Sequence, residues 1–373
     1  MIPIPPPKAA HASFHTTFAE SNQHWLATVN AFTTQNQALN IHRQSFAHSL
    51  RGPDHGELAT DVLWLGVEDA ARVVIFISGT HGIEGYAGSA IQRFLLGQLS
   101  NANELRIPSD VALLFIHALN PWGMAWGRRC DEQGIDLNRN FVDFNQPLPA
   151  NPHYPQAKTW LQLDDAVERR GGLEKLEQRL GRTAYEQAVS GGQYVDRDGP
   201  FYGGNGPAFG NHTIEQIIDS YHLSNRKLTV IDLHTGLGPW GYGELICDHP
   251  AGSAGECYAR QLFGDAVAVP AKGSSFSVPK LGLLDYRWHR LMAADSCFLT
   301  LEFGSYATDD LFNVIIDDHN LWRKFRTPAQ AVDIMAAQRQ RMVRHFCPDD
   351  RYWRQAVLFK AWQVAHRILE PTV

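Results

Sequence analysis

The sequence predicts a layered α/β fold, because apolar segments typical of buried strands alternate with segments whose apolar residues have helical spacing. Residues 111–118 (VALLFIHA) are continuously apolar, as expected for a strand that helices cover on both faces. With 373 residues the chain can bury a thick core, and no linker divides it. We therefore expect a single domain over residues 1–373.

The first part of the chain predicts a helix, followed by strands that alternate with a second helix. Residues 14–50 are expected to be mostly helical, because Phe18, Trp25 and Phe32 recur there at helical spacing. Turn residues bound the apolar segments that come next. The expected strands are residues 61–66, 73–78 and 111–118, and the expected helix is residues 87–99.

Residues 145–215 differ from the rest of the chain in composition. They begin proline-rich, continue through a stretch that predicts two helices, and end in a glycine-rich loop. Because no strand pattern occurs there, we interpret them as a helical and loop insertion carried on the main domain. The sheet is expected to resume at residues 228–233, 266–269 and 296–303, before a helical C-terminal part.

Composition and charge exclude several classes of protein. The net charge of −6 gives no electrostatic reason to expect nucleic acid or an anionic membrane as a partner. No run of 18 or more apolar residues occurs, so no membrane span is expected. The five cysteines are scattered without a C-x-x-C pair, and the first residues, MIPIPPPK, lack the apolar segment of a secretory signal. These features predict a cytoplasmic protein.

The segment VVIFISGTHGIEG places His81 and Glu84 just after an apolar strand. Sites in α/β sheets are built at the carboxyl ends of strands, and a neutral imidazole and a carboxylate are both good zinc ligands. H-x-x-E pairs also occur by chance in ordinary loops, so a pair of loop residues without a ligand is the alternative here.

The next polar segment, NPWGMAWGRRCDEQGIDLNRNF, follows the strand at residues 111–118. It contains Arg128, Arg129, Asn138 and Arg139, and guanidinium groups suit the bidentate capture of a carboxylate. An exposed arginine-rich loop or an exposed edge strand at DLNRN would also explain this pattern.

The segment VIDLHTGLG again ends an apolar strand with a histidine, His234. Together with the first pair it would complete two histidines and one carboxylate, which leaves a fourth zinc position open, as in catalytic sites. Asp232 lies on the same strand face and is expected to orient the His234 ring. A buried histidine bonded to the backbone is the alternative.

The segment FLTLEFGSY places Glu302 inside an apolar strand, where an unpaired charge is costly. A general base with a raised pKa and a structural glutamate paired with an arginine are both compatible with this position. Each of these signals is weak alone. Their joint occurrence, each at the end of an apolar strand, favours a catalytic metal site.

In this order, the motifs H-x-x-E, D-L-N-R-N-F, D-L-H-T and L-E-F-G resemble the zinc carboxypeptidase superfamily, the M14 peptidases. They are also similar to the related aspartoacylases and succinylglutamate desuccinylases. The resemblance covers roughly two-thirds of the chain, from about Val73 to Tyr306, and is greatest to an M14-like bacterial subgroup of unassigned substrate. It implies a three-layer α/β fold with a mixed, twisted sheet of roughly eight strands flanked by helices.

The resemblance also implies roles for individual residues. One zinc ion is implied, with His81, Glu84 and His234 as its ligands. Glu302 matches the glutamate that activates water.

The same resemblance implies how the substrate is held. Asn138 and Arg139 match the pair that binds the substrate carboxylate. The arginine that polarises the scissile carbonyl is Arg128 or Arg129, and we expect Arg129. The substrate-binding tyrosine of carboxypeptidases would be Tyr286, with Tyr242 as the alternative.

The implied function is that of a zinc-dependent metallohydrolase that cleaves an amide bond next to a free carboxylate, as a carboxypeptidase acting on small peptides. An N-acyl amino acid deacylase of the aspartoacylase type would use the same residues. A two-metal aminopeptidase would need further ligands, for which only His117, Asp232 and His289 are candidates. A non-enzymatic ligand-binding protein is a further alternative. Neither the natural substrate nor the oligomeric state follows from the sequence.

Overall fold

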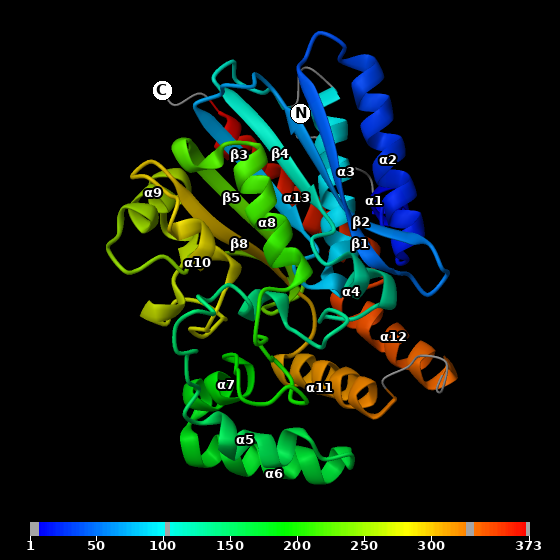
Figure 1. Cartoon of the computed structure of the whole chain (residues 1–373), viewed down its shortest axis with the longest axis vertical. Helices are drawn as coiled ribbons and strands as arrows, with labels where there is room; N and C mark the ends of the chain where they lie inside the picture. The colour runs from blue at the N-terminus through cyan, green and yellow to red at the C-terminus, as the bar shows by residue number, and fades with distance from the viewer. Residues whose placement is uncertain (1–6, 101–104, 326–331, 371–373) are drawn as a thin grey trace.

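A computed structural model of the chain describes residues 7–100, 105–325 and 332–370. Its centre is a mixed eight-stranded sheet with the order β1-β2-β4-β3-β5-β8-β6-β7 (Figure 1). The middle strands β4, β3, β5 and β8 run parallel, and β2 and β6 flank them as antiparallel neighbours. The strands are β1 (Ile41–Arg51), β2 (Glu57–Leu65), β3 (Arg72–Ser78), β4 (Val111–His117), β5 (Lys227–Gly236), β6 (Gly243–Ile246), β7 (Val267–Ala268) and β8 (Cys297–Gly304).

Helices cover both faces of this sheet and thereby form the three layers (Figure 1). One face is covered by α1 (Pro7–Ala12), α2 (Phe18–Gln35), α3 (Gly85–Ser100), α9 (Ala254–Phe263) and α13 (Arg351–Leu369). The opposite face is covered by α8 (Phe209–Ser220) and α10 (Leu284–His289). The expected three-layer α/β class with a mixed eight-stranded sheet is therefore confirmed.

Strand β3 shows how the sequence divides the core between the two faces. Val74 and Phe76 belong to the apolar cluster under α3, whereas Val73, Ile75 and Ile77 belong to the cluster under α8. Successive side chains of a strand point to opposite faces, so a continuously apolar segment is needed where both faces are covered.

A further group of helices lies at the carboxyl ends of the parallel strands, apart from the two covering layers (Figure 1). These helices are α4 (Pro121–Trp126), α5 (Tyr154–Leu161), α6 (Ala166–Leu180), α7 (Arg182–Ser190), α11 (Thr308–Phe325) and α12 (Val332–Phe346). In the described part of the chain, no helix is both long enough and apolar enough to cross a bilayer.

Most expected elements are confirmed, and residues 14–50 are the main error. The helix there ends at Gln35, where Asn36 caps it with hydrogen bonds to the carbonyl of Phe32, and residues 41–51 form the edge strand β1. Antiparallel pairing with β2, a contact that the local pattern does not show, decides the conformation of β1. The two helices expected within residues 145–215 are α6 and α7, whereas the short strand β6 and the helix α5, which begins in the proline-rich part, were not expected.

The packing of α3 on β3 yields a stability prediction. A Cβ atom at Gly88 would lie 2.5 Å from the Cβ of Ser78, whereas one at Gly97, on the same helix, would meet no atom within 4 Å. We expect Gly88→Ala to lower the free energy of unfolding by about 1–3 kcal/mol through overpacking. Gly97→Ala should raise it by about 0.5–1 kcal/mol through helix propensity. Denaturant unfolding of both variants checks this, and equal stabilities would contradict the close packing.

Candidate active site

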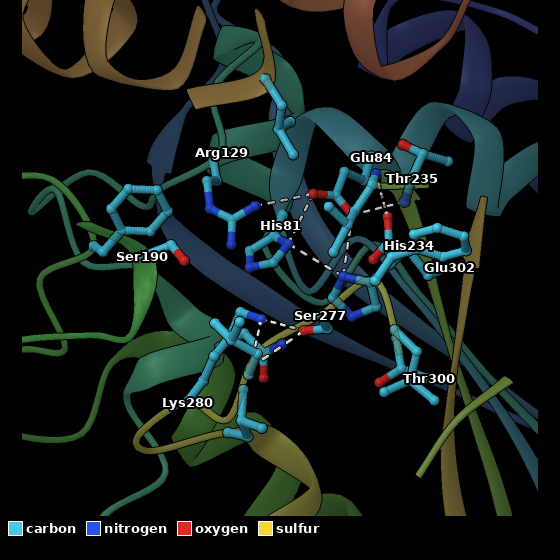
Figure 2. A pocket seen from close by; sticks show the side chains of 18 of the residues that line it. His81, Glu84, Arg129, Ser190, His234, Thr235, Ser277, Lys280, Thr300 and Glu302 are labelled. Carbon is cyan, nitrogen blue, oxygen red and sulfur yellow. Dashed lines mark hydrogen bonds and ion pairs between the residues drawn. The ribbon is translucent and has the colours of Figure 1, made fainter. Parts of the chain in front are cut away.

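The polar residues at the ends of the apolar strands meet at one edge of the sheet (Figure 2). His81 and Glu84 come from the turn after β3, His234 from the end of β5, and Glu302 from the end of β8. In the pairing of β5 with β8, His234 lies directly opposite Glu302, so both side chains point to the same face. The parallel arrangement of these strands therefore brings the four residues together.

Glycines shape the turn that carries His81 and Glu84. Gly79, with a φ of +73°, ends β3 in a conformation that other residues adopt only with strain. His81 then precedes a 3₁₀ turn, η1 (Gly82–Glu84), that leads into α3. A Cβ atom at Gly82 would lie 2.1 Å from the carbonyl carbon of Gly123, so only glycine allows α4 to pack this closely.

The same turn is joined to the arginine segment by backbone hydrogen bonds. The amides of Gly82 and Ile83 donate to the carbonyls of Arg129 (3.1 Å) and Arg128 (2.8 Å). Two segments about 45 residues apart are thereby fixed against each other.

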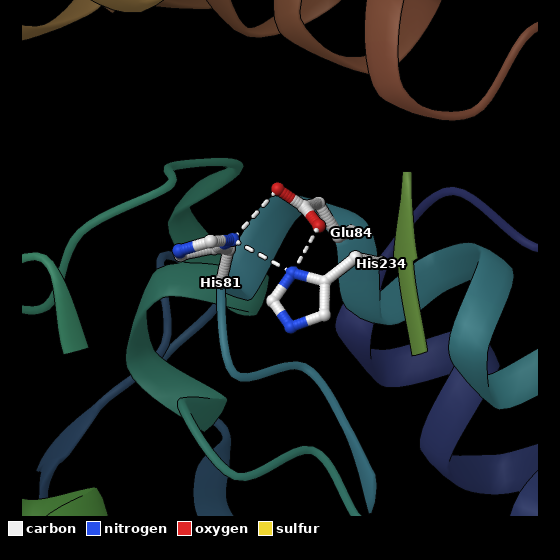
Figure 3. A group of neighbouring side chains, drawn as sticks. All are labelled: His81, Glu84 and His234. Carbon is white, nitrogen blue, oxygen red and sulfur yellow. Dashed lines mark hydrogen bonds and ion pairs between the residues drawn. The ribbon is translucent and has the colours of Figure 1, made fainter. Parts of the chain in front are cut away.

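Three side chains converge on one point (Figure 3). His81 Nδ1 lies 2.8 Å from a carboxylate oxygen of Glu84 and 3.2 Å from Nδ1 of His234. His234 Nδ1 lies 3.1 Å from the other oxygen of Glu84. All three residues are buried, and their donor atoms lie within 4.8 Å of one another, an arrangement that could hold a metal ion.

Buried carboxylates determine which ring nitrogens of the two histidines carry hydrogen. His81 Nε2 donates to Asp136 (3.1 Å), and His234 Nε2 donates to Asp232 (2.6 Å), which is the orienting role expected for Asp232. A carboxylate can only accept, so Nε2 is protonated in both rings. Both Nδ1 atoms therefore present lone pairs to the common point, as in metal sites with carboxylate-oriented histidines.

The donor set fits a divalent cation such as zinc. Ligands about 2.0–2.1 Å from a tetrahedral zinc ion lie roughly 3.3 Å from one another. The closest donor contacts of His81, Glu84 and His234 are 2.8, 3.1 and 3.2 Å. Two lone pairs and a carboxylate that face one another repel unless a cation lies among them. An ordinary pair of loop residues does not explain this convergence.

Ionisation in the absence of metal supports the same conclusion. Burial alone would lower the pKa of His234, but the carboxylates of Asp232 and Glu84 outweigh burial and raise this pKa well above its usual value. Burial would raise the pKa of Glu84, but His81 and His234 lower it strongly. The site thus takes up positive charge at the point where its donors meet.

Glu302 is a buried carboxylate without a basic partner in the described part of the chain. Its Oε1 accepts a hydrogen bond from the backbone amide of Leu237 (3.0 Å). Burial and the nearby carboxylate of Glu84 raise the pKa of Glu302 to about 7. Glu302 is therefore not a structural glutamate paired with an arginine. Its raised pKa is typical of a general base.

The two adjacent arginines point in different directions. Arg129 lines the pocket and donates to Glu84 (3.2 Å) and Asp136 (3.0 Å). Arg128 instead pairs with Asp318 (3.0 Å) and stacks on Trp322, away from the pocket-lining residues. Of the two candidates, the structure brings only Arg129 to the metal donors.

Asn138 and Arg139 lie in a short 3₁₀ turn, η2 (Leu137–Arg139), and not in an edge strand. Both line the pocket, and the amide oxygen of Asn138 accepts from the backbone of Leu284 (2.8 Å). The guanidinium of Arg139 donates to the carbonyls of Ser190 and Asn138, and no carboxylate of the described residues pairs with it. Two of its five N–H groups stay available to a ligand.

The pocket has charged residues that the sequence patterns did not indicate. Lys280 donates to the hydroxyl of Ser277 and the carbonyl of Val278, and burial together with the Arg139 guanidinium lowers its pKa to about 8. Asp248 and Asp285 also line the pocket, and burial and Asp248 raise the pKa of Asp285 well above its usual value. None of the three lies in a motif that distinguishes it from a surface charge.

The structure does not bring the candidate tyrosines into the described lining of the pocket. The hydroxyl of Tyr286 donates to the carbonyl of Lys280 (2.9 Å), behind the residue that does line it. Tyr242 is half-exposed and packs edge-on against Phe276, with ring centroids 6.4 Å apart. A substrate-binding role for Tyr286 stays a prediction without support from these contacts.

The candidates for a second metal site are dispersed. His117 lies in the middle of the sheet, bonded to Ser89 and stacked on Trp25. His289 stacks on His249 with ring centroids 3.6 Å apart. Among the described residues, the group of His81, Glu84 and His234 is the one arrangement of three or more such side chains with the spacing of a metal site.

The chain is similar to several known proteins. A family model described as a protein of unknown function, DUF2817, matches residues 18–360, whereas no curated protein matches the chain. Similar solved structures include carboxypeptidase A from Helicoverpa armigera, with 13% identity, 87% of this chain and 73% of that chain covered, and a TM-score of 0.48. Bovine thrombin-activatable fibrinolysis inhibitor shares 11% identity over 89% of this chain and 97% of its own, with a TM-score of 0.45.

The succinylglutamate desuccinylase from Chromobacterium violaceum is also similar, with 15% identity, 80% of this chain and 77% of that chain covered, and a TM-score of 0.34. The similar structures thus include carboxypeptidases and desuccinylases, the groups that the sequence motifs resemble. Because these TM-scores are below 0.5, the chemistry has to be argued from the side chains of this chain.

The carboxylate behind His234 leads to a prediction about metal affinity. We expect Asp232→Asn to weaken zinc binding by about 10- to 100-fold, because an amide does not hold the Nε2–H tautomer as a carboxylate does. Competition with a chelator of known affinity measures this change. Asp248→Asn is the matched control, since Asp248 lines the pocket but bonds neither histidine. Equal zinc affinities in the two variants would contradict the assigned donor geometry.

Proposed function

The chain belongs to the DUF2817 family of proteins of unknown function, and from this premise we propose that it is a zinc-dependent hydrolase. It would cleave an amide bond next to a free carboxylate. The observation that carries this proposal is the convergence of two imidazole lone pairs and the Glu84 carboxylate, beside the buried, unpaired Glu302, in the wall of one pocket.

His81, Glu84 and His234 would hold the zinc ion. Three protein ligands leave one position open, as in catalytic zinc sites. Zinc supplies Lewis-acid chemistry, which lowers the pKa of water and polarises a carbonyl group.

Glu302 would move the proton during hydrolysis. Its carboxylate takes a proton from the attacking water and passes it to the nitrogen of the leaving amine. A pKa of about 7 suits both transfers near neutral pH. The hydrogen bond from the Leu237 amide fixes Oε1 and leaves Oε2 for the proton transfer.

Arg129 would stabilise the negative charge that develops on the carbonyl oxygen. Its guanidinium is already fixed by Glu84 and Asp136, so little reorganisation is needed when the charge forms. Prearranged donors of this kind contribute about 100- to 1,000-fold to turnover.

Asn138 and Arg139 would hold the carboxylate of the substrate. Asn138 and Arg139 line the pocket, and the Arg139 guanidinium is close enough to Lys280 for its charge to lower the pKa of Lys280. A carboxylate bound there fixes the orientation of the adjacent amide relative to Glu302 and Arg129. Orientation would therefore come from groups that take no part in bond cleavage.

Deacylation of N-acyl amino acids would use the same residues and differs only in the acyl group. One observation favours a small substrate of this kind. Glu186, Ser190 and Phe201 line the pocket, and all three belong to residues 145–215, which we interpret as an insertion on the main domain. This segment therefore closes part of the space that a long peptide would occupy.

The role of Glu302 leads to a prediction about activity. Glu302→Gln should keep the zinc content of the wild type and lower kcat by about 100- to 10,000-fold, because the amide cannot take up a proton. Elemental analysis and release of the free amino acid from hippuryl and N-acetyl amino acids measure both properties. Glu186→Gln, which changes another glutamate of the pocket wall, should lose far less activity. A fully active Glu302→Gln protein would exclude the proposed base.

The role of Arg139 leads to a second prediction, about substrate selection. The wild type should prefer a substrate with a free carboxylate over its methylamide, and Arg139→Gln should reduce this preference by about 10- to 100-fold. The ratio of the two kcat/KM values does not depend on the fraction of folded enzyme. Arg128→Gln is the control, because it removes a buried arginine outside the pocket lining and should leave the ratio unchanged. An unchanged ratio in Arg139→Gln would show that the carboxylate binds elsewhere.

A further inference from the structure

We propose that the part of the pocket beyond the metal ligands is a closed apolar chamber that accepts a short, uncharged acyl group. The substrate is then an N-acyl amino acid with an apolar acyl group, and not a peptide with a free or extended N-terminal side. This inference rests on the proposed function, because that function places the substrate carboxylate at Arg139 and the scissile carbonyl at Arg129.

The chamber is formed by side chains from three segments that are distant in the sequence. Its residues are all apolar and buried, and they come from the loop before α8, from α11 and from α12: Phe201, Leu311, Phe312, Ile315 and Phe346. Phe201 and Phe312 pack edge-on with ring centroids 6.5 Å apart. None of these five side chains carries a polar atom, and the two threonines that line the pocket close to them, Thr308 of α11 and Thr235 beside His234, are uncharged.

The chamber lies on the far side of the metal ligands from the carboxylate-binding residues. Lys280 and Ser277 lie on one side of His81 and His234, and Glu84 with Thr235 lies on the other (Figure 2). Helix α12 contacts the turn η1, which carries Glu84, and α11 packs against α12.

Contacts with the ligand segments support the same placement. A Cβ atom at Gly236, two residues after His234, would lie 2.9 Å from Phe346 and 3.1 Å from Leu311. The guanidinium of Arg129 borders the chamber, because it donates to Glu84 and covers the ring of Phe201 at 5.6 Å. A substrate with its carboxylate at Arg139 and its carbonyl at Arg129 therefore directs its acyl group into the chamber.

The charges near the chamber are already paired. Glu186 lines the pocket but forms an ion pair with Arg182, and Arg129 is held by Glu84 and Asp136. An ammonium or a carboxylate on the acyl group would lose its water there without gaining a partner, which is costly. The chamber therefore discriminates against charged acyl groups, including the free amino terminus of a dipeptide.

Hydrogen bonds hold the wall of the chamber in place. Asn320 of α11 donates to the carbonyl of Leu161 at the end of α5 (2.8 Å). Gln338 of α12 donates to the carbonyl of Val314 on α11 (3.0 Å). Both side chains are buried, so opening this wall would leave unsatisfied polar groups. The length of the acyl group is limited accordingly.

Matched pairs of substrates test the chamber directly. Propionyl and glycyl groups have the same size but differ by one ammonium, and butyryl and succinyl groups differ by one carboxylate. All substrates carry the amino acid that is released fastest from its N-acetyl form. We expect the kcat/KM of the propionyl substrate to exceed that of the glycyl substrate by roughly tenfold or more, and the kcat/KM of the butyryl substrate to exceed that of the succinyl substrate by the same factor. Each methylene group added between acetyl and butyryl should raise kcat/KM by up to about fourfold, and acyl chains longer than butyryl should lose this gain.

The readout includes binding as well as turnover. Values of kcat/KM are measured on the zinc-loaded wild type, and dissociation constants of the intact substrates are measured by calorimetry on zinc-loaded Glu302→Gln. If the dissociation constants favour the neutral acyl groups as expected but no substrate is cleaved, the proposed hydrolysis is wrong and the chamber stands. If amides are cleaved but glycyl and succinyl substrates match their neutral partners, the hydrolase stands and the chamber is wrong. Absence of binding by every acyl amino acid overturns the chamber too.

A pair of variants on one helix separates the chamber from general effects on folding. Ile315→Thr makes a chamber side chain polar and one carbon atom shorter, and it should lower the butyryl-to-acetyl ratio about threefold or more. Val314→Thr introduces the same polar side chain one residue earlier, at a buried position that does not line the pocket. Val314→Thr should leave the ratio unchanged. Equal ratios in the two variants would overturn the assignment of Ile315 to the chamber.

Discussion

The burial of His81, Glu84 and His234 around a common point is the constraint on which the rest of the site depends. Three groups with lone pairs within 3.2 Å of one another are unfavourable in a dry interior unless a cation compensates them. The surrounding carboxylates Asp136 and Asp232 increase the need for positive charge, and they also determine which nitrogen of each histidine faces the centre. Without a metal ion, a proton on His234, whose pKa is raised well above its usual value, supplies positive charge at this point.

The sheet satisfies this constraint because its central strands are parallel. Parallel strands end at one edge, so residues that follow β3, β5 and β8 meet without long loops. Gly82 allows α4 and the arginine segment to approach the metal-binding turn, and backbone hydrogen bonds then fix Arg129 beside Glu84. Short segments at the ends of β3 and β5 supply His81, Glu84 and His234, and packing between distant segments supplies the groups that orient them.

Within the described part of the chain, the pocket carries unpaired positive charge on one side of His81 and His234, and on the other side it is lined by buried apolar side chains from α11 and α12. Arg139 and Lys280 provide positive charge on the first side, while Phe312 and Ile315 form part of the second. A molecule with a carboxylate at one end and an apolar group at the other fits this division in one orientation. Different parts of the chain supply the two sides, because Lys280 lies in the loop before α10, whereas Phe312 and Ile315 lie on α11.

The sequence by itself indicated the α/β class and the candidate site residues His81, Glu84, His234 and Glu302, because each follows or ends an apolar strand and this relation is local. Tertiary structure alone decided which arginine enters the pocket, since Arg128 and Arg129 have the same chemistry and differ only in the partners that distant helices provide. Likewise, the edge strand β1, the approach of Lys280 and the apolar chamber depend on pairing and packing between segments far apart in the chain. A local pattern records which face of an element is apolar, but not which distant residue will cover it.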